Sequence, residues 1–190
     1  HFYFKPADQR ARSTVSMNAL KEGIRVWDRD INRFLTSDYV PLYNPVEEYL
    51  YDTGRWDGKD RIRALADLVP CHNPHWQELF YRWFLGMVAH WRGMDRQHGN
   101  NTSPLLVGSQ GFRKSTFCRI LLPPELRFGY TDSIDFKSRQ EAERSLGRFL
   151  LVNIDEFDQI SINQQGFLKH LLQKPVANLR KPYGSTIREM

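Results

Sequence analysis

Apolar residues recur at helical spacing through the first half of the chain. From Ala11 to Phe34, the apolar residues near this spacing are Val15, Leu20, Ile24, Trp27, Ile31 and Phe34. A spacing close to one helical turn places such side chains on one face of a helix. The segment therefore predicts a helix, in which Gly23 is a weak point because glycine disfavours helix interiors.

Two Asn-Pro pairs predict the starts of further helices. Asn44 can cap a helix whose first turn accepts the following proline, and Asn73-Pro74 repeats the signal before a long helix to about Trp91. Between them, Trp56–Gly58 predicts a turn and a short helix follows from about Arg61. The aromatic residues of the long helix are expected to pack in a core: Trp76, Phe80, Trp83, Phe84 and Trp91.

The pattern changes after a polar stretch at residues 92–103, which is the predicted domain boundary. Residues 1–95 predict a helical N-terminal subdomain. Beyond the boundary, the predicted strands are Leu105–Val107, Phe128–Thr131 and Phe149–Ile154, and the predicted helices are Lys114–Leu122, Ser138–Gly147 and one capped by Asn163. Such alternation is typical of a parallel sheet covered by helices, so residues 96–190 predict an α/β domain. The stretches around Lys181–Gly184 predict a closing hairpin.

Composition narrows the class of protein only slightly. The 190 residues are 41% hydrophobic, which is ordinary for a globular protein, and carry a net charge of +5. A basic chain can bind a polyanion, although a solvated basic surface explains the charge equally well. Two cysteines and no membrane-spanning run indicate a cytoplasmic protein without a disulfide framework or a membrane partner. Because the chain starts at His1 and stops at Met190 within a strand-like stretch, we expect a fragment of a longer protein.

The strongest chemical signal follows the first predicted strand. Nine residues there resemble a nucleotide phosphate-binding loop: Gly108, Ser109, Gln110, Gly111, Phe112, Arg113, Lys114, Ser115 and Thr116. In such a loop, backbone N–H groups point at phosphate oxygens, so Lys114 would bind the β- and γ-phosphates of ATP and Ser115 would bind Mg²⁺. The pattern expects glycine at Arg113. If that position needs a positive φ, the arginine is strained by about 1–3 kcal/mol.

A pair of carboxylates gives the second signal. The apolar run Phe149–Ile154 leads directly into Asp155 and Glu156. A buried strand with this ending places both carboxylates at the carboxyl edge of the sheet, beside the phosphate loop. Asp155 would hold Mg²⁺ and Glu156 would activate the attacking water, so Lys114 and Glu156 are the catalytic candidates. Ring-forming NTPases also use an arginine from a neighbouring subunit, and four arginines are candidates: Arg144, Arg148, Arg180 and Arg188.

Four segments resemble the virulence-associated protein E family of phages and mobile elements, including its Bacteroides-type relatives. They are Asn44–Leu50, Trp56–Ile62, Gly108–Phe117 and Phe149–Asp158. The second segment, Trp-Asp-Gly-Lys-Asp-Arg-Ile, is the most distinctive, because many families share the nucleotide motifs. The resemblance implies a P-loop NTPase core like that of AAA+ proteins and superfamily 3 helicases, which acts in replication of mobile DNA. The resemblance also implies a sensor asparagine on the strand that follows the Asp155-Glu156 pair, and that strand is not identifiable in this sequence.

The resemblance also implies partners. Related helicases form ring-shaped homo-oligomers and grip single-stranded DNA with a lysine on a hairpin. By resemblance Lys181 is the candidate for that lysine and Tyr183 for a stacking partner. An ordinary solvated turn explains the same two residues.

Three functions stay open at this stage. The first is an ATP-hydrolysing core of a DNA helicase or translocase. The second is a nucleotide-dependent DNA-binding or assembly module with little turnover, which the arginine at position 113 favours. The third is a small-molecule P-loop kinase, which the Asp155-Glu156 pair disfavours because it indicates water as the acceptor.

Overall fold

The chain is described by a computed structural model that covers residues 8–41, 43–94, 102–134, 136, 138–155, 157, 160–173, 178–180 and 187–189. It divides into two compact units, His1–Glu48 and Tyr49–Met190. The division falls inside helix α3 (Pro45–Asp52). Most of the predicted boundary stretch, residues 95–101, lies outside the described residues, so a subdomain limit at residue 95 stays a prediction.

The first unit contains two helices, α1 (Gln9–Lys21) and α2 (Asp28–Leu35). The single helix predicted over residues 11–34 is wrong, because the chain turns at Gly23, where φ is +76°. Only glycine adopts this left-handed backbone without a steric cost, so the residue named as a weak point ends the helix.

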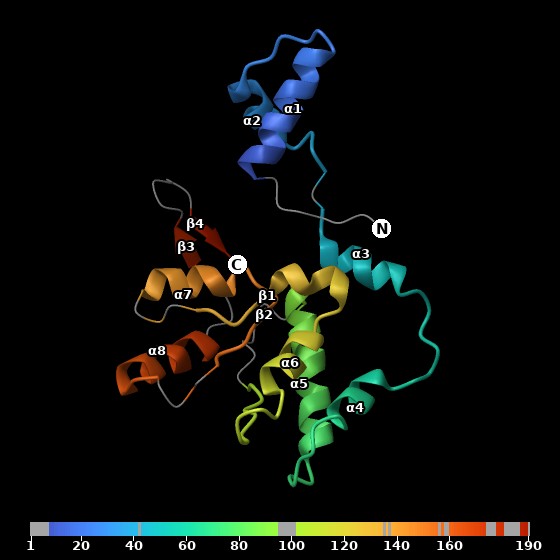
Figure 1. The fold of residues 1–190 in the computed structure, drawn as a ribbon, viewed down its shortest axis with the longest axis vertical. Helices are drawn as coiled ribbons and strands as arrows, with labels where there is room; N and C mark the ends of the chain where they lie inside the picture. The colour runs from blue at the N-terminus through green and yellow to red at the C-terminus, as the bar shows by residue number, and fades with distance from the viewer. Residues whose placement is uncertain are drawn as a thin grey trace. The chain divides into compact units, whose positions relative to one another are not determined.

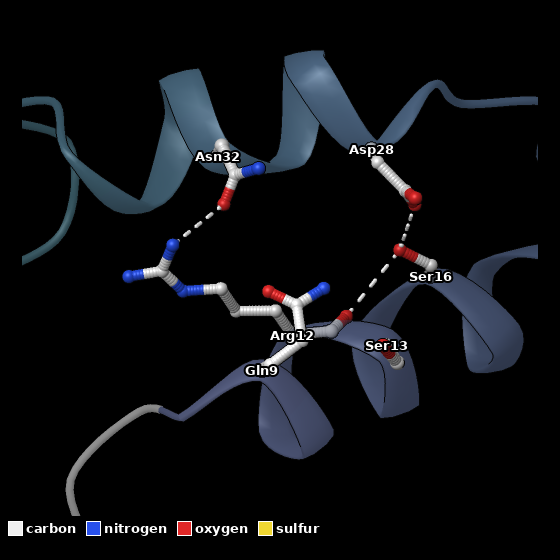
Figure 2. A pocket seen from close by; sticks show the side chains of 6 residues that line it. All are labelled: Gln9, Arg12, Ser13, Ser16, Asp28 and Asn32. Atoms are coloured by element: carbon white, nitrogen blue, oxygen red, sulfur yellow. Dashed lines mark hydrogen bonds between the residues drawn. The ribbon is translucent and has the colours of Figure 1, made fainter.

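Polar side chains join α1 to α2 (Figure 2). The Arg12 guanidinium donates to Asn32 Oδ1 over 3.1 Å, and Ser16 Oγ donates to Asp28 Oδ1 over 2.7 Å. In these two helices Ile31 is the one buried residue that the structure describes. Because a hydrogen bond adds only about 0.5–1.5 kcal/mol net, this helix pair is held weakly.

The second unit starts within α3 and continues with α4 (Arg61–Ala66) and α5 (Trp76–Trp91). Asn44 Oδ1 accepts from the backbone N–H groups of Val46 and Glu47, over 3.0 and 3.3 Å, which confirms the predicted cap of α3. Asp60 caps α4 by accepting from the Arg63 N–H over 2.9 Å. Each start satisfies N–H groups that the helix itself cannot pair.

The core of the second unit forms on the aromatic face of α5. Phe80, Ala66 and Leu121 are its buried centre, with Phe80 only 1% exposed. Seven half-buried residues pack around them: Ile62, Leu65, Trp76, Trp83, Phe84, Phe117 and Leu151. The predicted core role of the α5 aromatics is therefore confirmed for Trp76, Phe80, Trp83 and Phe84. Burying one such ring contributes about 1.5–3 kcal/mol.

A parallel pair of short strands follows the core helices. The elements here are α6 (Lys114–Ile120), the 3₁₀ helix η1 (Pro124–Gly129), β1 (Tyr130–Thr131), α7 (Arg139–Leu146) and β2 (Leu151–Val152). Tyr130 pairs with Leu151 and Thr131 with Val152. In Figure 1 the strand pair lies between α5–α6 on one side and α7–α8 on the other. A larger parallel sheet of the P-loop type stays a prediction.

Two sequence predictions in this region are wrong. Leu105–Val107 is not a strand: Leu105 and Val107 are 63% and 87% exposed, and no described segment pairs with this run. Helix α8 (Ile162–Gln173) contains Asn163 within its first turn, so the predicted cap there is displaced. Ser161 serves instead: Gln164 N donates to Ser161 Oγ over 3.4 Å, and Ser161 N donates to Gln164 Oε1 over 2.9 Å.

Helix α5 begins at Trp76 with His75 at its N-cap, so the start predicted at Asn73-Pro74 is displaced, whereas the signals of α7 and of the hairpin are confirmed. Ser138 Oγ accepts from the Glu141 N–H over 3.3 Å at the start of α7, and Gly147 ends that helix. A second small core joins α7 to α8, with Ala142 and Phe167 buried. Strands β3 (Asn178–Arg180) and β4 (Ile187–Glu189) pair antiparallel as the predicted hairpin, whose turn lies outside the described residues. Among the described helices, none has the length and apolarity needed to cross a membrane.

Gly129 leads to the first testable prediction. A Cβ added there would lie 2.6 Å from Leu150 Cγ, at the point where Leu150 N donates to Gly129 O over 2.7 Å. Gly129→Ala should lower the free energy of unfolding by about 1–3 kcal/mol, because the strand pair must separate to admit the methyl group. Urea unfolding followed by tryptophan fluorescence measures this.

Gly166→Ala is the matched control, since a Cβ at that position in α8 would meet nothing within 4 Å. It should leave stability unchanged or raise it by up to about 1 kcal/mol, because alanine suits a helix better. Equal effects of the two substitutions would mean that Gly129 is not closely packed.

Candidate functional site

The loop between residues 108 and 113 has two left-handed residues. Gly111 has φ +89°, and Arg113 has φ +56° and ψ +30°. Arg113 is the one non-glycine residue with positive φ in the described part of the chain. The phosphate-loop pattern places glycine at this position, and the backbone shows why: the turn into α6 needs a conformation that strains a side chain.

Lys114 begins α6 and reaches back over this loop. Its Nζ donates to the carbonyl oxygens of Gly108, over 2.8 Å, and Ser109, over 3.0 Å. The ammonium group therefore joins the start of the loop to its end. Both carbonyl partners are uncharged, so they hold the ammonium less strongly than an anionic oxygen would.

Ser115 and Asp155 meet across 40 residues of sequence. Ser115 Oγ, one residue into α6, donates to Asp155 Oδ2 over 2.8 Å. Asp155 lies three residues after β2, so the start of α6 meets the chain just beyond the end of β2. The structure thus brings Ser115 into contact with Asp155, so one residue from each of the two motifs meets the other.

Helix α5 positions both segments. The Phe80 ring lies 6.0 Å from the Phe117 ring of α6, centroid to centroid. At the other end of α5, Trp91 Nε1 donates to the Leu150 carbonyl over 2.7 Å, directly before β2. Sequence reasoning assigned Trp91 to core packing and missed this bond. No motif indicates it, because it depends on a contact between residues 59 positions apart.

Cys118 lies on α6, three residues after Ser115. Burial raises the pKa of its thiol, and the negative charge of Asp155 raises it further. The thiol is therefore protonated at neutral pH and a weak nucleophile. Tyr130 of β1, whose phenol pKa is also raised by burial, lies with its ring 5.4 Å from the Arg119 guanidinium. Neither group carries a charge of its own into the site at neutral pH.

The remaining predicted residues are exposed, half-buried or undescribed. The loop side chains of Ser109, Gln110 and Phe112 are exposed, as is Thr116 on α6. Arg144 forms an ion pair with Glu141, and the Arg148 guanidinium lies 5.5 Å from the ring of its neighbour Phe149. Three further predicted residues lie outside the described residues: Glu156, Lys181 and Tyr183. Within the described residues, no three His, Cys, Asp or Glu side chains gather as metal ligands do.

The conformation of Arg113 leads to the second prediction. Arg113→Gly should raise the free energy of unfolding by up to about 1 kcal/mol, because the relief of left-handed strain exceeds the entropy that glycine adds to the unfolded chain. Arg113→Ala keeps the strain and should leave stability within about 0.5 kcal/mol of the natural chain. Urea titrations of the three proteins compare them, and a loss of stability in Arg113→Gly would contradict the strain.

Comparison with known proteins places the second unit in a family. A family model described as the Virulence-associated protein E-like domain matches residues 50–190. The match begins one residue after the start of the second compact unit at Tyr49. No curated protein and no solved structure matches the chain. Because the family model covers well over half of the chain, this protein belongs to the virulence-associated protein E-like family.

Proposed function

We propose that this chain binds ATP with Mg²⁺ at residues 108–115 and hydrolyses it as the core of a DNA helicase or translocase. The hydrogen bond from Ser115 Oγ to Asp155 Oδ2 carries the proposal. Serine and aspartate at these two motif positions are the residues with which P-loop NTPases hold the metal of a nucleotide. A glycine-containing turn that binds no ligand would not require the carboxylate after β2 to contact the first turn of α6.

The donor atoms suit magnesium. Mg²⁺ prefers oxygen ligands and uses one or two carboxylates together with phosphate oxygens. Ser115 supplies a hydroxyl and Asp155 an exposed carboxylate, already in contact with each other. These two residues would hold the ion, which supplies neutralisation of the phosphate charge when bound.

Lys114 would bind the phosphates by exchanging partners. Its Nζ now donates to two uncharged carbonyls. Hydrogen bonds between an ammonium and an anionic oxygen are roughly twice as strong as bonds between neutral groups, so phosphate competes favourably for the lysine. The released carbonyls of Gly108 and Ser109 belong to exposed residues and can be solvated.

Glu156 is proposed as the base. It follows Asp155 directly, so its carboxylate would take a proton from the attacking water while Asp155 remains on the metal. The proposed partners are a second copy of the chain, which would supply an arginine, and single-stranded DNA, which would contact Lys181 and Tyr183 between β3 and β4.

A second candidate function rests on Arg113. An exposed arginine in the left-handed position of a phosphate loop adds a cation where the pattern has glycine. Such a loop can hold nucleotide tightly while it turns over slowly. The alternative is therefore a nucleotide-dependent DNA-binding or assembly module with little hydrolysis.

The third prediction tests the nucleotide site. Lys114→Ala should abolish Mg·ATP binding or weaken it by about 2–4 kcal/mol, because the main phosphate cation is lost. Isothermal titration calorimetry of both proteins measures the difference. Lys169→Ala, which removes an exposed lysine of α8, is the control for net charge and should bind as the natural chain does. Equal affinities for all three proteins would remove the site from loop 108–115.

The fourth prediction separates metal binding from water activation. Glu156→Gln should keep ATP affinity and lower the rate of phosphate release by about 10²- to 10⁴-fold, because the base is lost. Asp155→Asn should instead weaken the dependence of ATP affinity on Mg²⁺. Tight ATP binding by the natural chain with a release rate that Glu156→Gln leaves unchanged would favour the assembly module over the helicase core.

A further inference from the structure

The last two residues of α3 and the connection to α4, residues 51–60, form an unusual surface. All ten residues are exposed, and the connection forms an open arc in Figure 1. Two of its side chains are large aromatics, since Tyr51 is 86% and Trp56 is 77% exposed. The segment contains no aliphatic side chain. The proposed nucleotide site makes no use of it, although it overlaps the most distinctive motif of the sequence.

Local bonds give the segment a defined shape. Two glycines turn the backbone, Gly54 with φ +69° and Gly58 with φ +83°. Trp56 Nε1 donates to the Lys59 carbonyl over 3.2 Å, and Lys59 N donates to Asp57 Oδ1 over 3.1 Å. The indole therefore has its one polar atom bonded within the loop. No described aromatic or cationic side chain stacks on its faces.

The segment carries two cations and three carboxylates, and two of the carboxylates are paired with arginines of α4. Asp57 makes a two-point ion pair with Arg61, with both N–O distances 2.7 Å, and this pair lowers the pKa of Asp57 to about 2. Asp60 caps α4 and pairs with Arg63. Arg55 and Lys59 have no ion pair with any described residue, and Asp52 is the one carboxylate of the segment outside these pairs.

We propose that residues 51–60 bind single-stranded nucleic acid, with Trp56 as the base-stacking residue and Arg55 and Lys59 as phosphate contacts. An indole offers a flat face to any base, and neighbouring cations bind the backbone between bases. Apart from its two aromatic rings, the segment offers a protein or lipid partner no aliphatic side chain to bury. This surface would supply a second contact for the DNA partner of the proposed function, and nucleic acid would bind to it without ATP.

Tryptophan fluorescence of the 190-residue chain tests the proposal. The probes are oligothymidylate and oligouridylate of about 16 nucleotides, added without nucleotide or Mg²⁺. Stacking on Trp56 should quench the emission, and Trp56→Phe should remove most of that quenching. Trp56→Ala should weaken binding by about 5- to 100-fold, as expected for the loss of one base–aromatic stack, and Trp56→Phe should restore part of the affinity.

Trp27 provides a matched control, because it is also 77% exposed and lies in the first compact unit. Trp27→Ala should leave affinity unchanged, and Trp27→Phe should leave the quenching unchanged. An oligomer of abasic residues carries the phosphates without the bases, so it should bind through Arg55 and Lys59 but quench little. Lys59→Ala should reduce the dependence of log affinity on log salt by about 0.7, the value for one single-strand phosphate contact.

Several outcomes would overturn the proposal. They are an affinity unchanged by Trp56→Ala, equal losses in Trp56→Ala and Trp27→Ala, and a natural chain that binds neither oligomer. A change in sedimentation of Trp56→Ala without a change in nucleic-acid binding would assign the surface to a second copy of the chain. The two oligomers distinguish DNA from RNA as the partner. Trp56→Ala should bind ATP with the affinity of the natural chain in calorimetry. A failure of the proposed nucleotide site can therefore be told apart from a failure of this surface.

Discussion

The aromatic face of α5 determines where α6 and β2 lie. Strands β1 and β2 contain two residues each and α6 contains seven, lengths that are not stable alone in water. Phe80 holds α6 through Phe117, and Trp91 holds the start of β2 through the Leu150 carbonyl. The 2.8 Å contact between Ser115 and Asp155 therefore depends on a helix that supplies neither residue.

Local signals in the sequence predicted local structure well. A cap needs only a side chain that reaches an N–H two or three residues away, so Asn44 and Ser138 could be identified from their neighbours. The hairpin of β3 and β4 and the end of α7 at Gly147 belong to the same class. The phosphate-loop motif made strain at Arg113 conditional on a positive φ, because a glycine in a pattern often marks such a conformation, and the structure has that φ.

The failures share a different cause. A run such as Leu105–Val107 becomes a strand only if another segment pairs with it, and its own residues do not specify that partner. Ser161 and Asn163 could both cap α8. Ser161 lies two residues earlier and bonds to Gln164, so the helix begins directly after Ser161. The hydrogen bond between Trp91 and Leu150 depends on the tertiary arrangement, so sequence motifs could not predict how α5 supports the candidate site.

The two cysteines differ enough to make the natural chain useful for site-specific labelling. Cys71 is exposed in the connection that leads into α5, whereas Cys118 is half-buried on α6 with a raised pKa. Because alkylating reagents attack the thiolate, a short treatment near neutral pH modifies the exposed thiol first. A fluorophore can therefore be attached beside α5, the helix that holds the candidate site together, without any substitution in the sequence.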